Sequence, residues 1–104
     1  MCGIAGIIDP RLSPANRATA VGSMCDMMRH RGPDDSGTET RGSATIGMRR
    51  LAIFDPANGH QPMTSPDGRH TLVFNGAIYN FRVLRDELAA SGWSFQTHCD
   101  TEVL

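Results

Sequence analysis

Short apolar runs separated by turn residues organise the first part of the chain. Residues 3–8, GIAGII, predict a buried strand that ends at Asp9-Pro10. Ser13 offers a hydroxyl N-cap and Pro14 suits the first helical turn, so a helix is expected to begin there. The apolar face of this helix is expected to contain the residues that recur at helical spacing, which are Ala18, Val21, Cys25 and Met28.

The rest of the pattern predicts several strands, one long loop and two further helices. A turn cluster at 31–37, RGPDDSG, is expected to end the first helix at Gly32-Pro33. A second helix is expected within 80–92, with Asn80 as its N-cap and Gly92 beyond its end. The remaining predicted elements are strands at 44–48, 51–54, 70–76 and 93–97, a loop at 55–68, and a helix that begins with Asp100 as its cap.

The composition restricts the classes of function. The chain has 104 residues, 39% of them hydrophobic, and a net charge of −1, which suits one small globular domain. No apolar run reaches membrane-spanning length and no basic signal segment precedes the first strand, so the expected location is the cytoplasm, away from membranes. The basic residues are all arginines, which excludes lysine-dependent mechanisms, and their dispersal gives nucleic-acid binding no support.

Three cysteines, an odd number, predict free thiols and no disulfide framework. No C-x-x-C pair occurs and no histidine stands at a ligand spacing from a cysteine, so no metal site is predicted. Cys25 lies on the apolar helix face and is expected to be a core residue, as are the neighbouring Met24, Met27 and Met28.

Cys2 is placed where a structural cysteine has no need to be. If Met1 is removed, this residue carries a thiol and a free α-amino group within a few bonds of each other. α-Amino groups titrate near neutral pH and can serve as a general base, as they do for N-terminal threonine nucleophiles. The pattern indicates an N-terminal nucleophile; an incidental cysteine at the second position is the alternative.

Five segments, in the order MCGIAGI, RHRGPDDSG, RRLAIFD, FNGAIYN and DTEVL, together cover the chain from end to end. In this order they resemble the glutaminase domain of class II glutamine amidotransferases, the N-terminal-nucleophile type, and most of all its asparagine-synthetase-like branch. The resemblance implies an α+β fold, the α/β/β/α sandwich of N-terminal-nucleophile hydrolases. The family's domain is longer, so residues 1–104 are expected to form its N-terminal portion, an incomplete sandwich without the synthetase domain.

The resemblance also implies a role for five residues. Cys2 would be the catalytic nucleophile, and the Asn75 side chain with the Gly76 N–H would stabilise the oxyanion. Arg50 would hold the α-carboxylate of glutamine, and Asp100 would accept from its α-ammonium group. Structural alternatives stay open for two of these assignments: Asn75-Gly76 is a common turn pair, and Arg50 could be a solvated charge. Asp100 is expected to be a helix cap in either case, and its two oxygens make the cap compatible with a ligand contact.

Neighbouring motif residues receive lesser roles. Arg49 is the better candidate for a solvent-exposed arginine, and the RHRGPD signature at 29–34 is expected to shape the site without taking part in its chemistry. One departure from the family pattern is Ala77, where asparagine-synthetase-like members have a glutamate that helps to bind the substrate ammonium. The histidines outside the signature have no motif support and are expected on the surface or in loops; they are His60, His70 and His98.

The implied function is hydrolysis of the glutamine side-chain amide to glutamate and ammonia through a Cys2 thioester, with ammonia passed to an ATP-dependent amidation. The glutaminase step needs no cofactor, because ATP and Mg²⁺ would belong to the absent synthetase domain. The expected partners are glutamine and a synthetase domain or chain that accepts ammonia, with a homodimer left open. The alternative is a truncated, non-catalytic remnant or a half-domain that depends on a partner chain.

Overall fold

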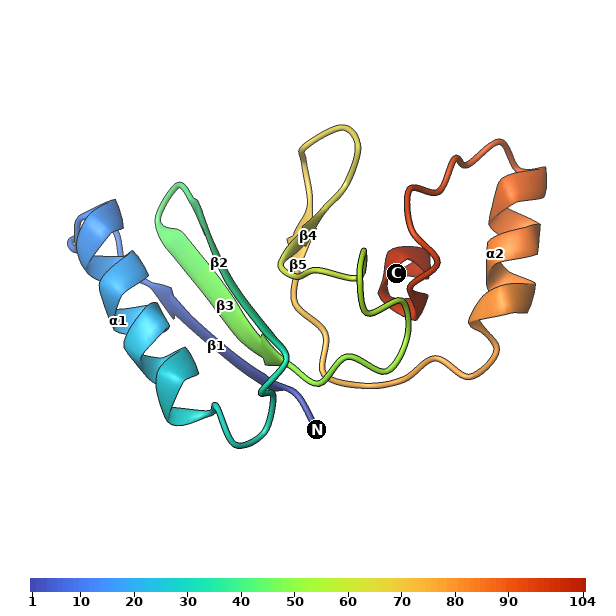
Figure 1. Cartoon of the computed structure of the whole chain (residues 1–104). Coiled ribbons are helices and arrows are strands. Elements are labelled where there is room, and N and C mark those ends of the chain that lie inside the picture. Colours follow the sequence, from blue (N-terminus) through green and yellow to red (C-terminus); the bar gives the residue numbers. More distant parts are fainter.

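The N-terminal half of the chain is an antiparallel three-stranded sheet with a helix on one face (Figure 1). The computed structural model describes all residues from Met1 to Leu104. The elements of this half are β1 (Gly3–Ile8), α1 (Pro14–Met27), β2 (Asp35–Arg41) and β3 (Ala44–Arg50). The sheet has the order β1-β3-β2. Gly3 of β1 lies opposite Arg49 of β3, and Asp35 of β2 lies opposite Arg50 of β3.

Helix α1 begins where its capping residues predict. The Ser13 hydroxyl accepts a hydrogen bond of 3.1 Å from the Asn16 N–H, which satisfies one of the unpaired N–H groups of the first turn. Val21 and Cys25 are buried against β3, where a Cβ at Gly47 would lie 2.8 Å from Val21. The absence of a side chain at Gly47 therefore lets the helix approach the sheet closely.

The C-terminal half has little regular structure. It consists of β4 (Met63–Thr64), β5 (Thr71–Leu72), α2 (Phe81–Ala90) and the 3₁₀ helix η1 (Asp100–Val103). β4 and β5 form a separate antiparallel pair between the large sheet and the α2–η1 unit, which lie at opposite ends of the molecule (Figure 1). The molecule measures 43 × 30 × 17 Å. Its radius of gyration of 14.5 Å exceeds the radius of gyration of roughly 13 Å that is expected for a compact chain of this length.

Several sequence predictions are confirmed. The strand at 3–8 and the helix that follows Ser13 form as expected, and Gly92, with φ of 94°, lies just beyond α2. Cys25 is buried, and the mixture of helices with antiparallel strands makes the fold α+β. None of the helices is both long and apolar enough to cross a membrane.

Other predicted elements are wrong, and most of these errors concern strands. The strand predicted at 51–54 is irregular, the one at 70–76 is reduced to β5, and 93–97 forms none. Conversely, β2 begins inside the turn cluster predicted at 31–37, and β3 extends to Arg50. These segments differ in whether a partner strand lies beside them, which local sequence does not encode.

Three capping or core predictions are also wrong. Met24 and Met27 are exposed, Met27 by 80%, because they point away from the sheet. Asn80 precedes α2 but its side chain makes no capping hydrogen bond. Asp100 lies inside η1, whose N-cap is Cys99, so its carboxylate is available for a different contact.

Candidate active site

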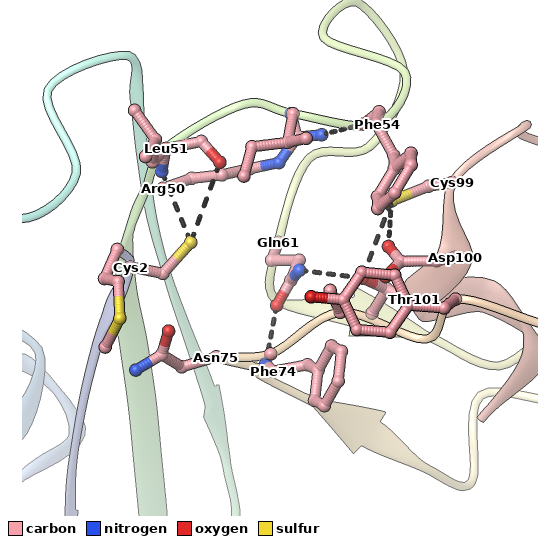
Figure 2. Close-up of a pocket in the computed structure, with 15 residues that line it drawn as sticks. Cys2, Arg50, Leu51, Phe54, Gln61, Phe74, Asn75, Cys99, Asp100 and Thr101 are labelled. Atoms are coloured by element: carbon pink, nitrogen blue, oxygen red, sulfur yellow. Dashed lines mark hydrogen bonds between the residues drawn. The ribbon is translucent and has the colours of Figure 1, made fainter.

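A cavity of about 300 Å³ lies where β1 begins and β3 ends, facing the irregular loops of the C-terminal half (Figure 2). Its walls come from the N-terminus, the end of β3 and its following loop, the segment after β5, and the start of η1. All the residues that the sequence assigned to a site line this cavity: Cys2, Arg50, Asn75, Gly76 and Asp100. They come from four separate stretches of the chain.

Cys2 is half-buried at the edge of the sheet, one residue before β1. Its sulfur accepts a hydrogen bond of 3.3 Å from the Leu51 N–H and lies 3.8 Å from the Leu51 carbonyl oxygen. The Arg31 Nε donates to the Cys2 carbonyl at 3.1 Å. The residue is therefore held on both its side chain and its backbone, while the preceding Met1 is 74% exposed.

Arg50 is only 4% exposed, so the alternative of a solvated charge is wrong for this residue. Its two Nη atoms donate to the carbonyls of the loop that follows, at 2.6 Å to Phe54, 3.1 Å to Asp55 and 3.2 Å to Pro56. None of the ion pairs involves Arg50. A buried cation with no anion beside it has a large desolvation cost, which an anionic ligand would offset.

Arg49 was expected in solvent, and this prediction is wrong. It is 6% exposed, and its Nε donates at 2.9 Å to the carbonyl of Gly32. Successive residues of a strand point to opposite faces, so Arg49 lies on the α1 side of β3 while Arg50 points into the cavity. The two adjacent arginines therefore lie on opposite faces of the sheet, and only Arg50 lines the cavity.

Asp100 is also 4% exposed and forms no ion pair. Its Oδ2 accepts from the Ile78 N–H at 2.9 Å, and the Cys99 thiol lies 3.5 Å from its Oδ1. The carboxylate thus anchors the segment after β5 and still presents oxygen lone pairs to the cavity. In Figure 2 it lies on the side of the cavity opposite Cys2.

Asn75 and Gly76 form the rim of the cavity, and both are exposed. They belong to an irregular stretch between β5 and α2, in which Gly76 is a bend and no hydrogen-bonded turn spans the pair, so the turn-pair alternative is not confirmed. A Cβ at Gly76 would lie 2.6 Å from the Phe74 ring, so a side chain there would displace the ring. Ala77 lines the same rim.

Sequence reasoning missed several lining residues. Gln61 is 3% exposed; its Oε1 accepts from the Phe74 N–H at 2.7 Å and its Nε2 donates to the Thr101 hydroxyl at 3.0 Å. Cys99 and Thr101 are buried on either side of Asp100. Thr101 belongs to the DTEVL motif, which could have identified it, whereas Cys99 precedes the motif and had no such signal. The apolar lining that was missed consists of Leu51, Ile53, Phe54, Phe74 and Tyr79.

Carboxylates hold the loops around the cavity by accepting from backbone N–H groups. Asp55 accepts from His98 at 2.8 Å, and Glu102 accepts from the N–H groups of Gln96 at 2.6 Å and Thr97 at 2.7 Å. The His98 N–H is the largest influence that lowers the pKa of Asp55 below its usual value. Charged side chains therefore replace the strand ladder that the sequence predicted at 93–97.

Cys25 and the three histidines outside the RHRGPD signature are separate from the cavity. Burial raises the pKa of the Cys25 thiol, which lies on the side of α1 that faces the sheet. His60, His70 and His98 are exposed as expected, and the Nδ1 of His60 is 2.7 Å from an Asp35 oxygen. No group of three or more metal-ligating side chains lies together.

Comparison with known proteins gives consistent matches. Residues 1–104 match the family model described as glutamine amidotransferase domain. The glutamine-hydrolyzing asparagine synthetase 1 of Bacillus subtilis is 42% identical over 106 residues, which is 100% of this chain and 17% of that protein. The glutamine-hydrolyzing asparagine synthetase B of Escherichia coli is 36% identical over 104 residues, 100% of this chain and 19% of that protein. The chain thus spans less than a fifth of these relatives' length.

Proposed function

The chain belongs to the glutamine amidotransferase domain family, and we propose that it hydrolyses the side-chain amide of glutamine to glutamate and ammonia. One observation carries the proposal. A buried arginine and a buried aspartate, Arg50 and Asp100, line one cavity with Cys2, and neither has an ion-pair partner. A free amino acid has a carboxylate and an ammonium group that complement these two charges, and its side chain would then extend toward the thiol.

The proposed nucleophile is the Cys2 sulfur, after removal of the exposed Met1. The new α-amino group would take the thiol proton, and the sulfur would attack the amide carbon of glutamine. Ammonia leaves with that proton, and water then hydrolyses the γ-glutamyl thioester to release glutamate and regenerate the thiol. The Leu51 N–H, 3.3 Å from the sulfur, supports this role by fixing the position of the attacking atom.

Asn75 and Gly76 are proposed to stabilise the negative oxygen of the tetrahedral intermediates. The support for this role is that both line the rim of the cavity and that neither the Asn75 amide nor the Gly76 N–H donates to another protein group. Donors that are free before the reaction need not break other bonds to bind the oxyanion. In Figure 2 the Asn75 side chain lies on the same side of the cavity as Cys2.

We also propose that residues 1–104 form the N-terminal part of a glutaminase domain with the α/β/β/α sandwich of N-terminal-nucleophile hydrolases. Two antiparallel sheets, one of them covered by α1, support this architecture. The relatives' names refer to asparagine synthetases, so the proposed acceptor of the ammonia is a synthetase domain or chain. ATP and Mg²⁺ would act there, and none of the steps above requires them.

A specific observation favours the alternative of a half-domain that needs a partner chain. Ile4 and Ile8 are 50% and 80% exposed on the face of the sheet opposite α1. Such an apolar sheet face is normally covered in a folded domain. The hydrolysis assay therefore decides between an active chain and one that requires a partner.

The test is glutamine hydrolysis by the purified chain and by its Cys2→Ala variant. We expect the chain to release ammonia, Cys2→Ala to release none, and Cys25→Ala to retain activity because its buried thiol lies outside the cavity. Intact mass is expected to show loss of Met1 in the active protein. Hydrolysis by a chain that retains Met1 would contradict the proposed base, and hydrolysis by Cys2→Ala would contradict the proposed nucleophile.

A further inference from the structure

We infer that Gln61 is a positioning residue, which joins the Asn75-Gly76 rim of the cavity to the wall that contains Asp100. The inference rests on the proposed glutamine hydrolysis, because it assigns a further residue to that site. Both ends of one buried amide are used: Oε1 accepts from the Phe74 N–H at 2.7 Å, and Nε2 donates to the Thr101 hydroxyl at 3.0 Å. Phe74 directly precedes Asn75, and Thr101 directly follows Asp100.

The stretch between β5 and α2, which contains Asn75 and Gly76, has few other restraints. β5 ends at Leu72, and between there and α2 the bonds from Phe74 to Gln61 and from Ile78 to Asp100 are the long-range contacts of the backbone N–H groups. Thus two side chains determine the shape of the stretch that contains the proposed oxyanion donors. Figure 2 shows the Gln61 amide between the Cys2 side of the cavity and the Thr101 side.

Gln61 itself is firmly placed by the large sheet. A Cβ at Gly37, in β2, would overlap the Gln61 carbonyl oxygen, so the backbone of Gln61 lies directly against the sheet. Gln61 is 3% exposed, and the oxygen and the nitrogen of its side-chain amide each have a protein partner. Although Gln61 lines the cavity, its amide is occupied by these two bonds, so it acts through Phe74 and Thr101 and fixes the position of both walls relative to the sheet.

The decisive variant is Gln61→Met, which keeps the volume of the side chain and removes both polar contacts. We expect the dissociation constant for glutamine, measured by calorimetry in the Cys2→Ala background, to rise roughly 10-fold. The reason is that the Phe74 N–H and the Thr101 hydroxyl each lose their hydrogen-bond partner. The matched control is Gln96→Met, at the chain's other glutamine, which is exposed, whose side-chain amide makes no hydrogen bond and which lies outside the cavity. Unchanged binding in Gln61→Met, or an equal loss in Gln96→Met, would overturn the inference.

Thr101→Val supplies a milder variant that removes the hydroxyl and keeps the shape. If the bridge acts as a unit, Thr101→Val should weaken glutamine binding in the parent and have no further effect in Gln61→Met. Additive losses would show that the two residues act independently, which contradicts the bridge.

Amide hydrogen exchange provides a readout that does not need substrate. In Gln61→Met the Phe74 and Ile78 amides should exchange at least 10-fold faster, while the amides of β3 keep their rates; a general loss of stability would accelerate all of them. If the parent protein fails to bind glutamine, the proposed function is wrong, and the exchange measurement still decides the inference. An unchanged Ile78 rate would refute the coupling between the two walls.

Discussion

Replacing Arg50 by lysine separates the charge of this residue from the geometry of its donors. A guanidinium has five N–H donors, and three of those of Arg50 are used by the carbonyls of Phe54, Asp55 and Pro56. Two donors remain for a substrate carboxylate. A lysine ammonium has three donors in total and a shorter reach, so it cannot hold the same three carbonyls and also bind the substrate.

The expected magnitude follows from the bonds that are lost. Charge-assisted hydrogen bonds contribute about 1.5–3 kcal/mol each, and Arg50 is 4% exposed, so solvent screens them little. Because lysine retains the charge, we expect Arg50→Lys to lose about 2–3 kcal/mol of glutamine binding. This corresponds to a roughly 30- to 150-fold higher KM, with a smaller change in kcat because the residue lies away from the reacting atoms.

The assay is steady-state glutamine hydrolysis, with Arg49→Lys as the matched control and thermal unfolding measured for both variants. Arg49 is equally buried but donates to Gly32 and Pro33 on the other face of β3. Both variants should therefore unfold at a lower temperature, and only Arg50→Lys should raise KM substantially. Equal increases in KM, or a loss confined to kcat, would refute the assignment of Arg50 to the substrate carboxylate.

Three other changes test the surroundings of the cavity. Ala77→Glu should tighten glutamine binding, by about 1–3 kcal/mol at most in calorimetry, because it adds a second carboxylate for the substrate ammonium; weaker binding would contradict this. The pKa of Asp55 is lower in the folded protein than in the unfolded chain, so the ionised carboxylate stabilises the fold at any pH above its unfolded-state pKa. This contribution is lost as the pH falls through the folded-state pKa. Asp55→Asn should therefore lower the unfolding temperature at pH 6, with the difference shrinking in titrations toward pH ~3; a difference independent of pH would be inconsistent with this origin. Gly59→Ala should raise the KM for glutamine, since its Cβ would overlap the Arg50 guanidinium, and an unchanged KM would show that the guanidinium can move without consequence.

The sequence was sufficient for the elements whose signals are local and for the composition of the cavity. The GIAGII strand and the Ser13 cap need only neighbouring residues to form, and both are observed. The five residues taken from the motifs line one cavity, although four separate segments supply them. Their chemical roles remain predictions.

The sequence was insufficient where a segment depends on distant partners. β2 is polar and begins in a turn-like stretch, yet it pairs along its length with β3. The apolar segment 51–54 resembles a strand, but the Leu51 carbonyl faces the Cys2 thiol and the Phe54 carbonyl accepts from the Arg50 guanidinium. Gln61 lies in a loop without any motif, and its importance follows only from the two segments that fold against it. Asp55, with φ of 43°, is a further case of local geometry that long-range contacts determine.

The carboxylates that accept backbone N–H groups in the loops around the cavity have a consequence for engineering. A loop that is held by backbone hydrogen bonds keeps its path when most side chains change, whereas here the carboxylates of Asp55 and Glu102 together hold residues 96–98. Neither residue lines the cavity. Libraries that alter substrate preference should therefore include these remote positions, because substitutions there reshape the walls of the cavity while every residue that faces the substrate stays the same.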